Sequence, residues 1–386
     1  MDEVDQSIAG PRVLFWHWGR RGGGPRYTLE LLRALIEKSS LALFVSYSRQ
    51  SELAQEFERL PIPRLVVDTY TDLRTAIYST FRIRSAREKF WNYLEDQHID
   101  VILCTMSHLW NFPVLWRHDR GNKRYVFVLH DAVPHPGDDV PMRRWLLRKE
   151  IACADGIVTL SRHVLQTVVD ECAYPDARVW VIPHGVFKYA PTAERPTTRF
   201  RSDRFRLLFF GRVLAYKGLD ILLQAYLILK EECPQVTLRI VGAGDLEPYR
   251  ALLGQAVGVD VENRWIGESE IGDIFSDADL LVVPYREASQ SGVIPTAYAS
   301  GLPVVVTPVG GLIEQTQHLR TGLVAESASP EALAKAIKRM VTDPEIYSSC
   351  ADGAAEEARE RLSWPAIAAR FEEVIRKVAS LPPLRG

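Results

Sequence analysis

The sequence predicts an α/β protein of two domains, each a doubly wound parallel sheet. Short apolar runs rich in β-branched and aromatic residues alternate with longer segments of helical period along the 386 residues. These runs are continuous, as expected of strands that are covered on both faces. The stretch Lys188–Arg204 is rich in Pro, Thr and Arg and has no apolar period, which is typical of a linker. It divides the strand–helix repeats into two halves of similar length.

The predicted elements follow the chain in two series. The first series of strands is Arg12–Phe15, Leu41–Ser46, Arg64–Val67, Asp100–Cys104, Tyr125–Leu129, Gly156–Thr159 and Arg178–Ile182. The second series is Arg206–Phe210, Val236–Val241, Val261–Trp265, Leu280–Val283 and Pro303–Val306. Helices are predicted over Tyr27–Glu37 and, after a capping Ser363 and an early Pro, over a final amphipathic segment that runs to Val378. We therefore expect domains over residues 1–190 and 200–362 that face each other across a cleft, where ligands bind at the carboxyl ends of the strands.

Composition narrows the class of protein. The formal charge of −2 argues against a nucleic-acid binder dominated by positive charge. The five cysteines are scattered and form no CxxC pair, so neither a zinc site nor a disulfide framework is indicated. The start, Met1–Asp5, is acidic and lacks the apolar core of a signal peptide. No apolar run approaches the roughly 18 residues of a membrane span. We expect a cytoplasmic protein.

Two cations mark the start of the second domain. In Leu207–Asp220 a strand ends at Gly211, and Arg212 and Lys217 flank the start of the next helix. A helix N-terminus favours negative charge, so two cations beside it suit a diphosphate. The competing interpretation is a pair of solvated surface cations, which the flanking glycines and the strand-to-helix turn disfavour.

Two glycine-rich stretches resemble nucleotide-binding motifs, but neither matches the full motif. In Leu238–Glu247 the third glycine of a GxGxxG fingerprint is Glu247, so a nicotinamide dehydrogenase is disfavoured. Arg20–Gly24 follows a strand but lacks the Gly-Lys-Ser/Thr of a P-loop. The glycines still permit close backbone approach to a ligand, with plain turn glycines as the alternative.

The order and spacing of several short motifs resemble the retaining GT-B glycosyltransferases of family 4 (glycosyltransferases group 1). In the second domain the motifs are Gly211-Arg212, Lys217–Asp220, Val241–Gly244, Trp265–Gly267, Ala278–Pro284, Ala299–Val306 and Gly310–Leu312. The first domain matches more loosely, through Gly22–Gly24, Leu129–Asp131 and Val181–Gly185.

The resemblance implies a GT-B architecture of two Rossmann-like domains, with the helix at residues 364–386 joining the first, and a role for each matched residue. Arg212 and Lys217, with Gly211 at the turn, would neutralise the diphosphate of a UDP- or GDP-linked sugar, and His130 would touch the donor sugar. The remaining donor contacts would be Gly23 and Gly24 at the phosphates or the sugar, and Gly242, Gly244, Trp265 and Ile266 at the base.

The loop after Pro284 departs from the family pattern. The resemblance places a sugar-binding acid four residues past this Pro and a ribose-binding acid eight residues further on, and those positions are Ala288 and Thr296. We interpret Glu287 as the sugar-binding acid, shifted by one residue, and Thr296 as a hydroxyl for the ribose. Ser291, Gly292 and Val293 fall at a predicted helix start, where N–H groups bind phosphate.

The chemistry expected is metal-independent glycosyl transfer. Cations of the protein can stabilise the leaving diphosphate, and the sequence has no aspartate-rich metal loop. No cofactor or metal ligand is indicated, and no dedicated base is evident. The resemblance implies retention of anomeric configuration. A nucleotide-sugar epimerase of similar fold and a non-catalytic transferase-like subunit stay open as alternatives.

The acceptor is expected to be a saccharide or lipid-linked saccharide bound by the first domain. Basic residues and tryptophans cluster there, which suits an anionic membrane surface or a lipid diphosphate, with a solvated face as the alternative. The residues are Arg74, Arg82, Arg84, Arg87, Lys89, Trp91, Trp110, Trp116, Arg143, Arg144 and Trp145.

Overall fold

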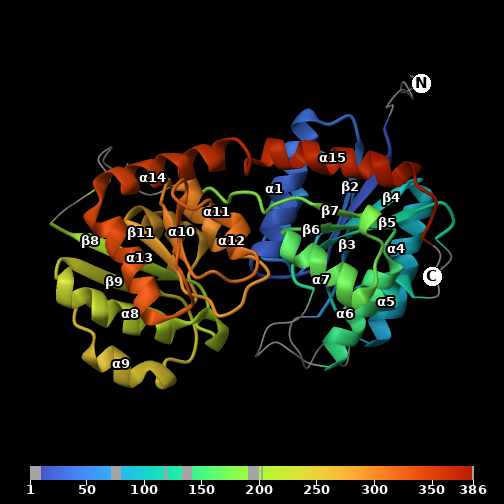
Figure 1. The fold of residues 1–386 in the computed structure, drawn as a ribbon. Helices are drawn as coiled ribbons and strands as arrows, with labels where there is room; N and C mark the ends of the chain where they lie inside the picture. The colour runs from blue at the N-terminus through green and yellow to red at the C-terminus, as the bar shows by residue number, and fades with distance from the viewer. Residues whose placement is uncertain are drawn as a thin grey trace. The chain divides into compact units, whose positions relative to one another are not determined.

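The computed structural model describes residues 10–70, 80–116, 120–132, 141–189, 200 and 203–384, and these form two compact units, each described here by itself (Figure 1). Unit 1 is built from the described residues within Met1–Pro134, Asp139–Pro183 and Trp364–Gly386, and unit 2 from those within His184–Ser363. Most of the expected linker, Lys188–Arg204, lies outside the described residues, as does Arg74.

Unit 1 contains a seven-stranded parallel sheet in the order β3-β2-β1-β4-β5-β6-β7. Its strands are β1 (Arg12–His17), β2 (Ala42–Ser48), β3 (Arg64–Val67), β4 (Val101–Cys104), β5 (Arg124–Leu129), β6 (Gly156–Thr159) and β7 (Val179–Val181). The strand order reverses between β1 and β4. Ligands of doubly wound sheets bind at the carboxyl ends of the two strands that meet at such a switch point.

Unit 2 contains a six-stranded parallel sheet in the order β10-β9-β8-β11-β12-β13. Its strands are β8 (Phe205–Phe210), β9 (Val236–Val241), β10 (Val259–Glu262), β11 (Leu280–Val283), β12 (Val304–Val306) and β13 (Gly322–Val324). Here the switch point lies between β8 and β11. The loops that follow these two strands carry Lys217 and Glu287.

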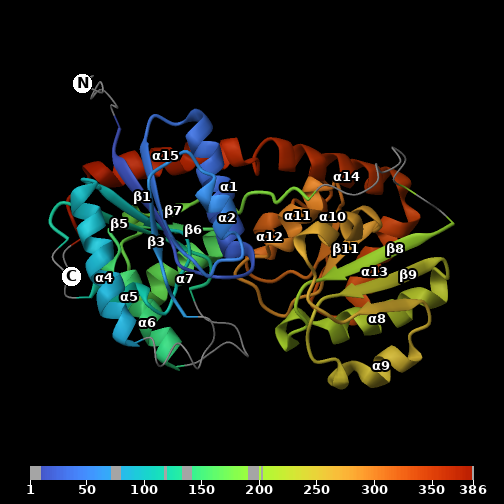
Figure 2. The same ribbon diagram turned by 180° about the vertical axis from the view of Figure 1, so that it is seen from behind.

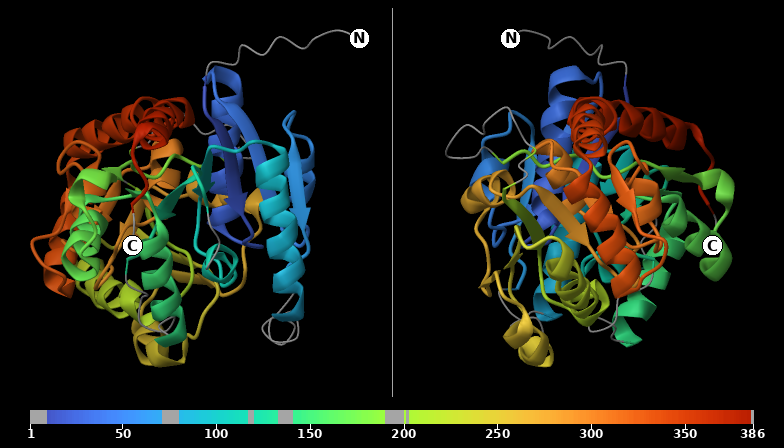
Figure 3. Two further views of the ribbon diagram at one scale, coloured as in Figure 1. Left: turned by 90° about the vertical axis from the view of Figure 1, so that its right-hand side faces the viewer. Right: turned by 60° about the vertical axis from the view of Figure 1, so that its left-hand side comes forward.

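Helices cover both faces of the unit 1 sheet. They are α1 (Gly23–Lys38), α2 (Ala54–Glu58), α4 (Thr80–Asp96), α5 (Asn111–Leu115), α6 (Pro141–Cys153), α7 (Arg162–Cys172) and α15 (Trp364–Ser380). The helices α4 to α7 enclose one core, and α15 packs against α1 (Figures 2 and 3). The contact is aromatic, because the rings of Tyr27 and Trp364 meet edge-on with centroids 5.2 Å apart. The last helix of the chain therefore belongs to the first unit.

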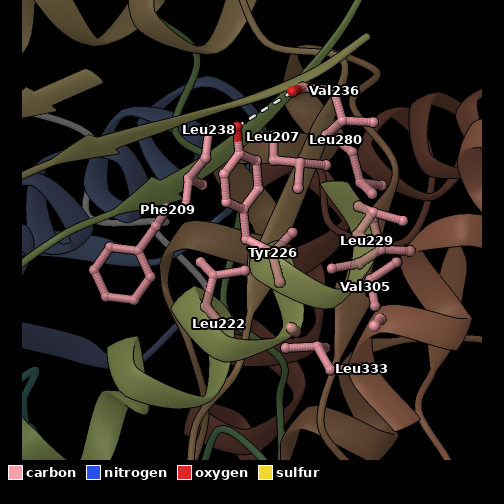
Figure 4. Close-up of a cluster of buried hydrophobic side chains, with 14 of the residues drawn as sticks. Leu207, Phe209, Leu222, Tyr226, Leu229, Val236, Leu238, Leu280, Val305 and Leu333 are labelled. Atoms are coloured by element: carbon pink, nitrogen blue, oxygen red, sulfur yellow. Dashed lines mark hydrogen bonds between the residues drawn. The ribbon is translucent and has the colours of Figure 1, made fainter. Parts of the chain in front are cut away.

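The unit 2 sheet also has a core on each face. The helices are α8 (Leu219–Glu232), α9 (Arg250–Gln255), α10 (Glu268–Ser276), α11 (Val293–Ala299), α12 (Leu312–Gln315), α13 (Pro330–Thr342) and α14 (Pro344–Arg359). The helices α8 and α13 bury one face, and α10, α11 and α14 bury the other. In the first core the hydroxyl of Tyr226 donates to the carbonyl of Val236 at 3.3 Å, which satisfies a polar atom among leucines (Figure 4).

The predicted fold class, two parallel-sheet α/β domains, is confirmed, and each predicted strand is present. The edge strand predicted over Val261–Trp265 begins and ends earlier, at Val259 and Glu262. Beyond Glu262 the side chain of Asn263, in place of the backbone, pairs with Gly244 after β9. The three-residue strand β13 was too short for its pattern to be seen. In the part of the chain that the structure describes, no helix has the length and apolarity of a membrane span.

Candidate active site

The loop after β8 holds Lys217 in a fixed place at the switch point of unit 2. Gly211 has φ +114°, and a Cβ there would lie 3.0 Å from Nζ of Lys217. The ammonium also lies 5.1 Å from the ring centroid of Tyr285, the second residue after β11. Arg212 is exposed at the same turn. The two predicted diphosphate cations therefore follow the same strand end, and one of them is fixed by packing.

Three contacts join the loop after β8 to the loop after β11. Gly218 has φ +65°, and a Cβ there would lie 2.0 Å from the carbonyl oxygen of Pro284, so only glycine fits. The backbone N–H of Arg286 donates to the carbonyl of Tyr216 at 2.7 Å. The guanidinium of Arg286 pairs with Asp220 at the start of α8. We call these three contacts the loop latch. Glu287 comes directly after it in the chain and is exposed. Lys217 and Glu287 are thus presented by two loops that are fastened together.

The glycines predicted at the base have a different reason for being glycine. A Cβ on Gly242 would lie 2.1 Å from the carbonyl oxygen of Gly211, and one on Gly244 would lie 2.3 Å from that of Val213. The missing side chains therefore admit the neighbouring protein loop, and contact of these glycines with a base stays a prediction. Asn263 also pairs with both backbone groups of Gly244, at 3.0 Å each.

Further along the same edge, Trp265 is 61% exposed, and Ile266 is half-buried. Their contact with a base stays a prediction.

The helix start after β11 also differs from expectation. The N–H of Ser291, predicted to bind phosphate, donates to Oε1 of Gln315 at 2.7 Å, and Nε2 of Gln315 donates back to the Ser291 carbonyl at 3.1 Å. Thr296 is buried in α11, and its hydroxyl donates to the carbonyl of Gly292 at 3.1 Å. The Ser291 N–H is therefore already used, and the Thr296 hydroxyl could only accept. Gly292 is the N-cap of α11, and Val293 is its first residue.

In unit 1, α1 begins inside the glycine triplet and not at Tyr27. Gly22 has φ +85°, and its N–H donates to Oε1 of Glu52 at 2.7 Å, which fixes the turn into the helix. Gly23 is exposed in the first turn. A Cβ on Gly24 would lie 2.6 Å from Sδ of Met106 and 2.8 Å from Cε1 of His17. Gly24 is therefore needed where α1 packs on the loop after β4.

His130 follows β5 and is oriented by the backbone. Its Nε2 lies 3.0 Å from the carbonyl oxygen of Thr105, and because a carbonyl only accepts, this nitrogen carries the proton. Burial lowers the pKa of the imidazole, so the ring is neutral near pH 7 and its Nδ1 has a lone pair. The ring meets Tyr27 edge-on at 5.3 Å. The geometry suits hydrogen bonding to a hydroxyl better than charge stabilisation.

A second histidine joins this site through a chain of hydroxyls. Nδ1 of His17 lies 3.1 Å from Oγ1 of Thr105, which lies 2.6 Å from Oγ1 of Thr28, and that hydroxyl donates to the carbonyl of Gly24 at 3.0 Å. His17 is buried, and burial lowers its pKa to about 3. Thr105 therefore links the histidines to α1. Sequence reasoning missed both residues, although each stands at the carboxyl end of a strand of the switch point.

Sequence reasoning also missed the amide side chains of Asn263 and Gln315. Each clamps the backbone of a loop residue 19 or 24 positions away, so no local pattern could reveal it. Across the described ranges, no group of three or more His, Cys, Asp or Glu side chains has an arrangement that could hold a metal ion.

The basic and aromatic residues predicted for a membrane contact divide into two groups. Trp116 and Trp145 are 51% and 50% exposed, and Met142 of α6 is 68% exposed. Trp91 and Trp110 are each 3% exposed, so the prediction that they reach a surface is wrong; both belong to the core beneath α4 and α5. Arg87 is half-buried and donates to the Trp116 carbonyl at 2.6 Å. The exposed cations of α4 and α6 are Arg82, Arg84, Lys89, Arg143, Arg144, Arg148 and Lys149.

Comparisons with known proteins agree with this architecture. Residues 204–343 match the family model Glycosyl transferases group 1, and residues 21–187 match the model Glycosyltransferase Family 4. A D-inositol 3-phosphate glycosyltransferase of Corynebacterium aurimucosum is 26% identical over 94% of this chain and 93% of its own. One from Thermobispora bispora is 30% identical over 57% of this chain and 55% of its own.

Solved structures share the fold. Sucrose-phosphate synthase from Thermosynechococcus elongatus superposes with a TM-score of 0.72 at 18% identity, covering 95% of this chain and 99% of its own. Anabaena HepE, solved in complex with UDP-glucose, gives a TM-score of 0.68 at 18% identity, covering 96% of this chain and 100% of its own. Two Rossmann-like sheets, two adjoining family matches and full-length relatives lead to one conclusion: the chain belongs to the family 4 (group 1) glycosyltransferases and is a glycosyltransferase of the GT-B fold.

Proposed function

We propose that this glycosyltransferase moves a hexose from a UDP- or GDP-linked sugar to a saccharide or lipid-linked saccharide, with retention of configuration and without a metal ion or other cofactor. The observation that carries the proposal is the placement of Arg212 and Lys217 at the switch point of the unit 2 sheet. The complex of Anabaena HepE with UDP-glucose supports a nucleotide-sugar donor, because that protein has the same fold.

In the proposed reaction the leaving diphosphate is stabilised by fixed charge. Lys217 is held between Gly211 and the ring of Tyr285, so its ammonium needs little reorganisation when negative charge develops on the bridging oxygen. Arg212 adds a second cation from the same turn. Together the fixed Lys217 and the exposed Arg212 are proposed to take the place that a divalent metal occupies in other transferases.

Glu287 of unit 2 is proposed to bind the transferred sugar, and His130 of unit 1 is proposed to touch it. The carboxylate of Glu287 accepts hydrogen bonds from sugar hydroxyls, and the neutral His130 accepts one at Nδ1. On the proposed retaining route, the bond from the anomeric carbon to the diphosphate breaks as the acceptor oxygen bonds to the same face. The acceptor proton passes to an oxygen of the departing diphosphate, so no separate base is needed.

A transfer assay with radiolabelled nucleotide sugars tests the proposal. UDP- and GDP-sugars are offered with saccharide, lipid-linked saccharide and inositol phosphate acceptors, the last because the named relatives glycosylate inositol 3-phosphate. Arg212→Ala and Lys217→Ala should each lower transfer by about two to three orders of magnitude. The matched control is Arg250→Ala, an 81%-exposed arginine on α9.

The outcomes separate the alternatives. Transfer that survives EDTA and fails in both variants supports the proposal. Wild-type rates in either variant, or strict dependence on a divalent ion, contradict the mechanism. Epimerised donor sugar would indicate the epimerase, and an unchanged donor under every condition would indicate a non-catalytic subunit.

The enzyme is further proposed to work at the inner face of the cell membrane, in the assembly of a surface polysaccharide or a glycolipid. The support is the surface of unit 1 formed by α4, α5 and α6, where α5 packs against both other helices (Figure 2). Met142, Trp116 and Trp145 project apolar groups among exposed arginines and lysines. This combination suits anionic lipid headgroups, since the cations meet phosphate while the apolar tips enter the interface.

A further inference from the structure

A buried carboxylate lies beneath the unit 1 site. Glu150 of α6 is 2% exposed and stands in the same buried stripe as Leu147 and Ile151. An ionisable group in that position is costly unless it is hydrogen-bonded. The hydrogen bonds are present, and the groups at Asn111 and Cys104 also contact the loop after β4.

Two donors converge on one oxygen of Glu150, and a thiol lies near the same oxygen. Nδ2 of Asn111 and the hydroxyl of Tyr125 each donate to its Oε1 at 2.7 Å, and Sγ of Cys104 lies 3.9 Å away. Asn111 also lies 3.3 Å from the carbonyl oxygen of Met106, and Sγ of Cys104 lies 3.2 Å from the same oxygen. All of these side chains belong to β4, β5, α5 or α6, so the network spans the unit.

The network holds both ends of the segment Thr105–Trp110. Cys104 precedes this segment and Asn111 follows it. The Thr105 carbonyl accepts the His130 hydrogen bond, and the Met106 side chain abuts Gly24. A change at Glu150 is therefore transmitted to the group that orients His130.

We propose that Glu150 is a positioning residue for glycosyl transfer: through Asn111 and Cys104 its carboxylate fixes the segment Thr105–Trp110 and thereby the orientation of the His130 imidazole. The inference rests on the proposed function for the catalytic importance of His130. The coupling between the two side chains stands on the contacts alone.

Ionisation distinguishes this role from simple packing. The titratable groups that hydrogen-bond to Glu150 are Cys104 and Tyr125, whose own pKa values are raised by burial, so both stay protonated and donate. Burial raises the pKa of Glu150 to about 7. An ionised carboxylate binds the donors more strongly than a carboxylic acid does. The segment is therefore held more firmly above neutral pH than below it.

The test measures His130 directly. In protein labelled with ¹³Cε1-histidine, the His130 resonance is identified by its loss in His130→Gln. Because burial lowers the pKa of His130, the ring stays neutral near pH 7, and a shift there reports Glu150. We expect a midpoint near pH 7 in the wild type and no midpoint near pH 7 in Glu150→Gln. Tyr125→Phe removes a donor to the ionised carboxylate and should move the midpoint to higher pH. Glu171→Gln, on the exposed side of α7, is the matched control.

Kinetics supply the second readout. The ionised fraction of Glu150 rises from roughly one tenth at pH 6 to nine tenths at pH 8, so kcat should rise up to about ninefold in the wild type. That rise should be absent in Glu150→Gln, with little change in the KM for the donor. A wild-type His130 titration in Glu150→Gln, or an unmoved midpoint in Tyr125→Phe, would overturn the proposal. If Glu150→Gln does not fold, the midpoint of the His130 resonance in Tyr125→Phe tests the proposal instead. A shifted resonance in a protein without transferase activity would support the coupling and contradict the proposed function.

Discussion

The Glu150→Gln substitution should make unit 1 progressively more stable than the wild type as the pH rises. The pKa of Glu150 is about 7 in the folded protein, against an ordinary value of 4.5. Below pH 4.5 the carboxyl is protonated in both the folded and the unfolded state, and the wild type carries no penalty. Between these values the folded state binds more protons, so the stability of the wild type falls with pH. At about 1.4 kcal/mol for each pKa unit, the loss reaches roughly 3 kcal/mol and is constant above pH 7.

Tryptophan fluorescence can follow this change, because eight of the nine tryptophans lie in unit 1 and only Trp265 lies in unit 2. A domain of this size shifts its melting midpoint by about 2–4 °C for each kcal/mol. The midpoint difference between Glu150→Gln and the wild type should therefore grow by roughly 6–12 °C from pH 4.5 to 7.5. Other titrating groups cancel in the difference, and Glu171→Gln should show no trend. A pH-independent difference would mean that burial does not raise the Glu150 pKa, and the argument would fail.

Three further predictions concern the donor site, the loop latch and the surface of unit 1. Glu287→Gln should lower the transfer rate sharply, while the affinity for nucleoside diphosphate, measured by calorimetry, stays nearly unchanged. A wild-type transfer rate would mean that Glu287 does not bind the sugar. Gly218→Ala should lower the free energy of unfolding by more than about 2 kcal/mol, because φ is +65° and the carbonyl of Pro284 leaves no space for a Cβ. The melting midpoint in circular dichroism measures this loss. Wild-type stability of Gly218→Ala would contradict the close contact between Gly218 and Pro284 in the loop latch. Reversal of Arg143–Arg144 to Glu should abolish flotation with anionic vesicles, unlike reversal of Lys335 with Lys338 on α13; equal losses would remove the case for a specific surface.

The predictable part of this protein is the part that its hydrophobic pattern determines. Strands covered on both faces need continuous apolar runs, so they could be located from the sequence alone, often to the residue, as with Gly156–Thr159 and Leu280–Val283. The same regularity predicts where the strand-end loops fall. Arg212 and Lys217 could be found because they stand at such an end beside glycines that local rules already mark.

Contacts between loops were not predictable in this way. The sequence did not show that Gly242 and Gly244 pack against the carbonyl groups of Gly211 and Val213, which leave no space for a Cβ at either position. The N–H of Ser291 looked available, whereas Gln315 occupies it. A sequence reports that a side chain is missing or that a helix begins. The local sequence does not predict which distant segment fills the resulting space or forms the hydrogen bond.

Glu150 is a case in which the sequence did contain a signal. In α6 the buried apolar stripe passes through Leu147 and Ile151, and helical spacing places position 150 in the same stripe. A carboxylate there breaks the pattern that the rest of the helix obeys. Our estimate is that it costs roughly 3 kcal/mol at neutral pH. Natural sequences keep such local conflicts mainly where they serve a site. Glu150 lies one hydrogen bond from Asn111 and Tyr125 and one loop from His130. This position connects the break in the apolar pattern to the orientation of the His130 imidazole.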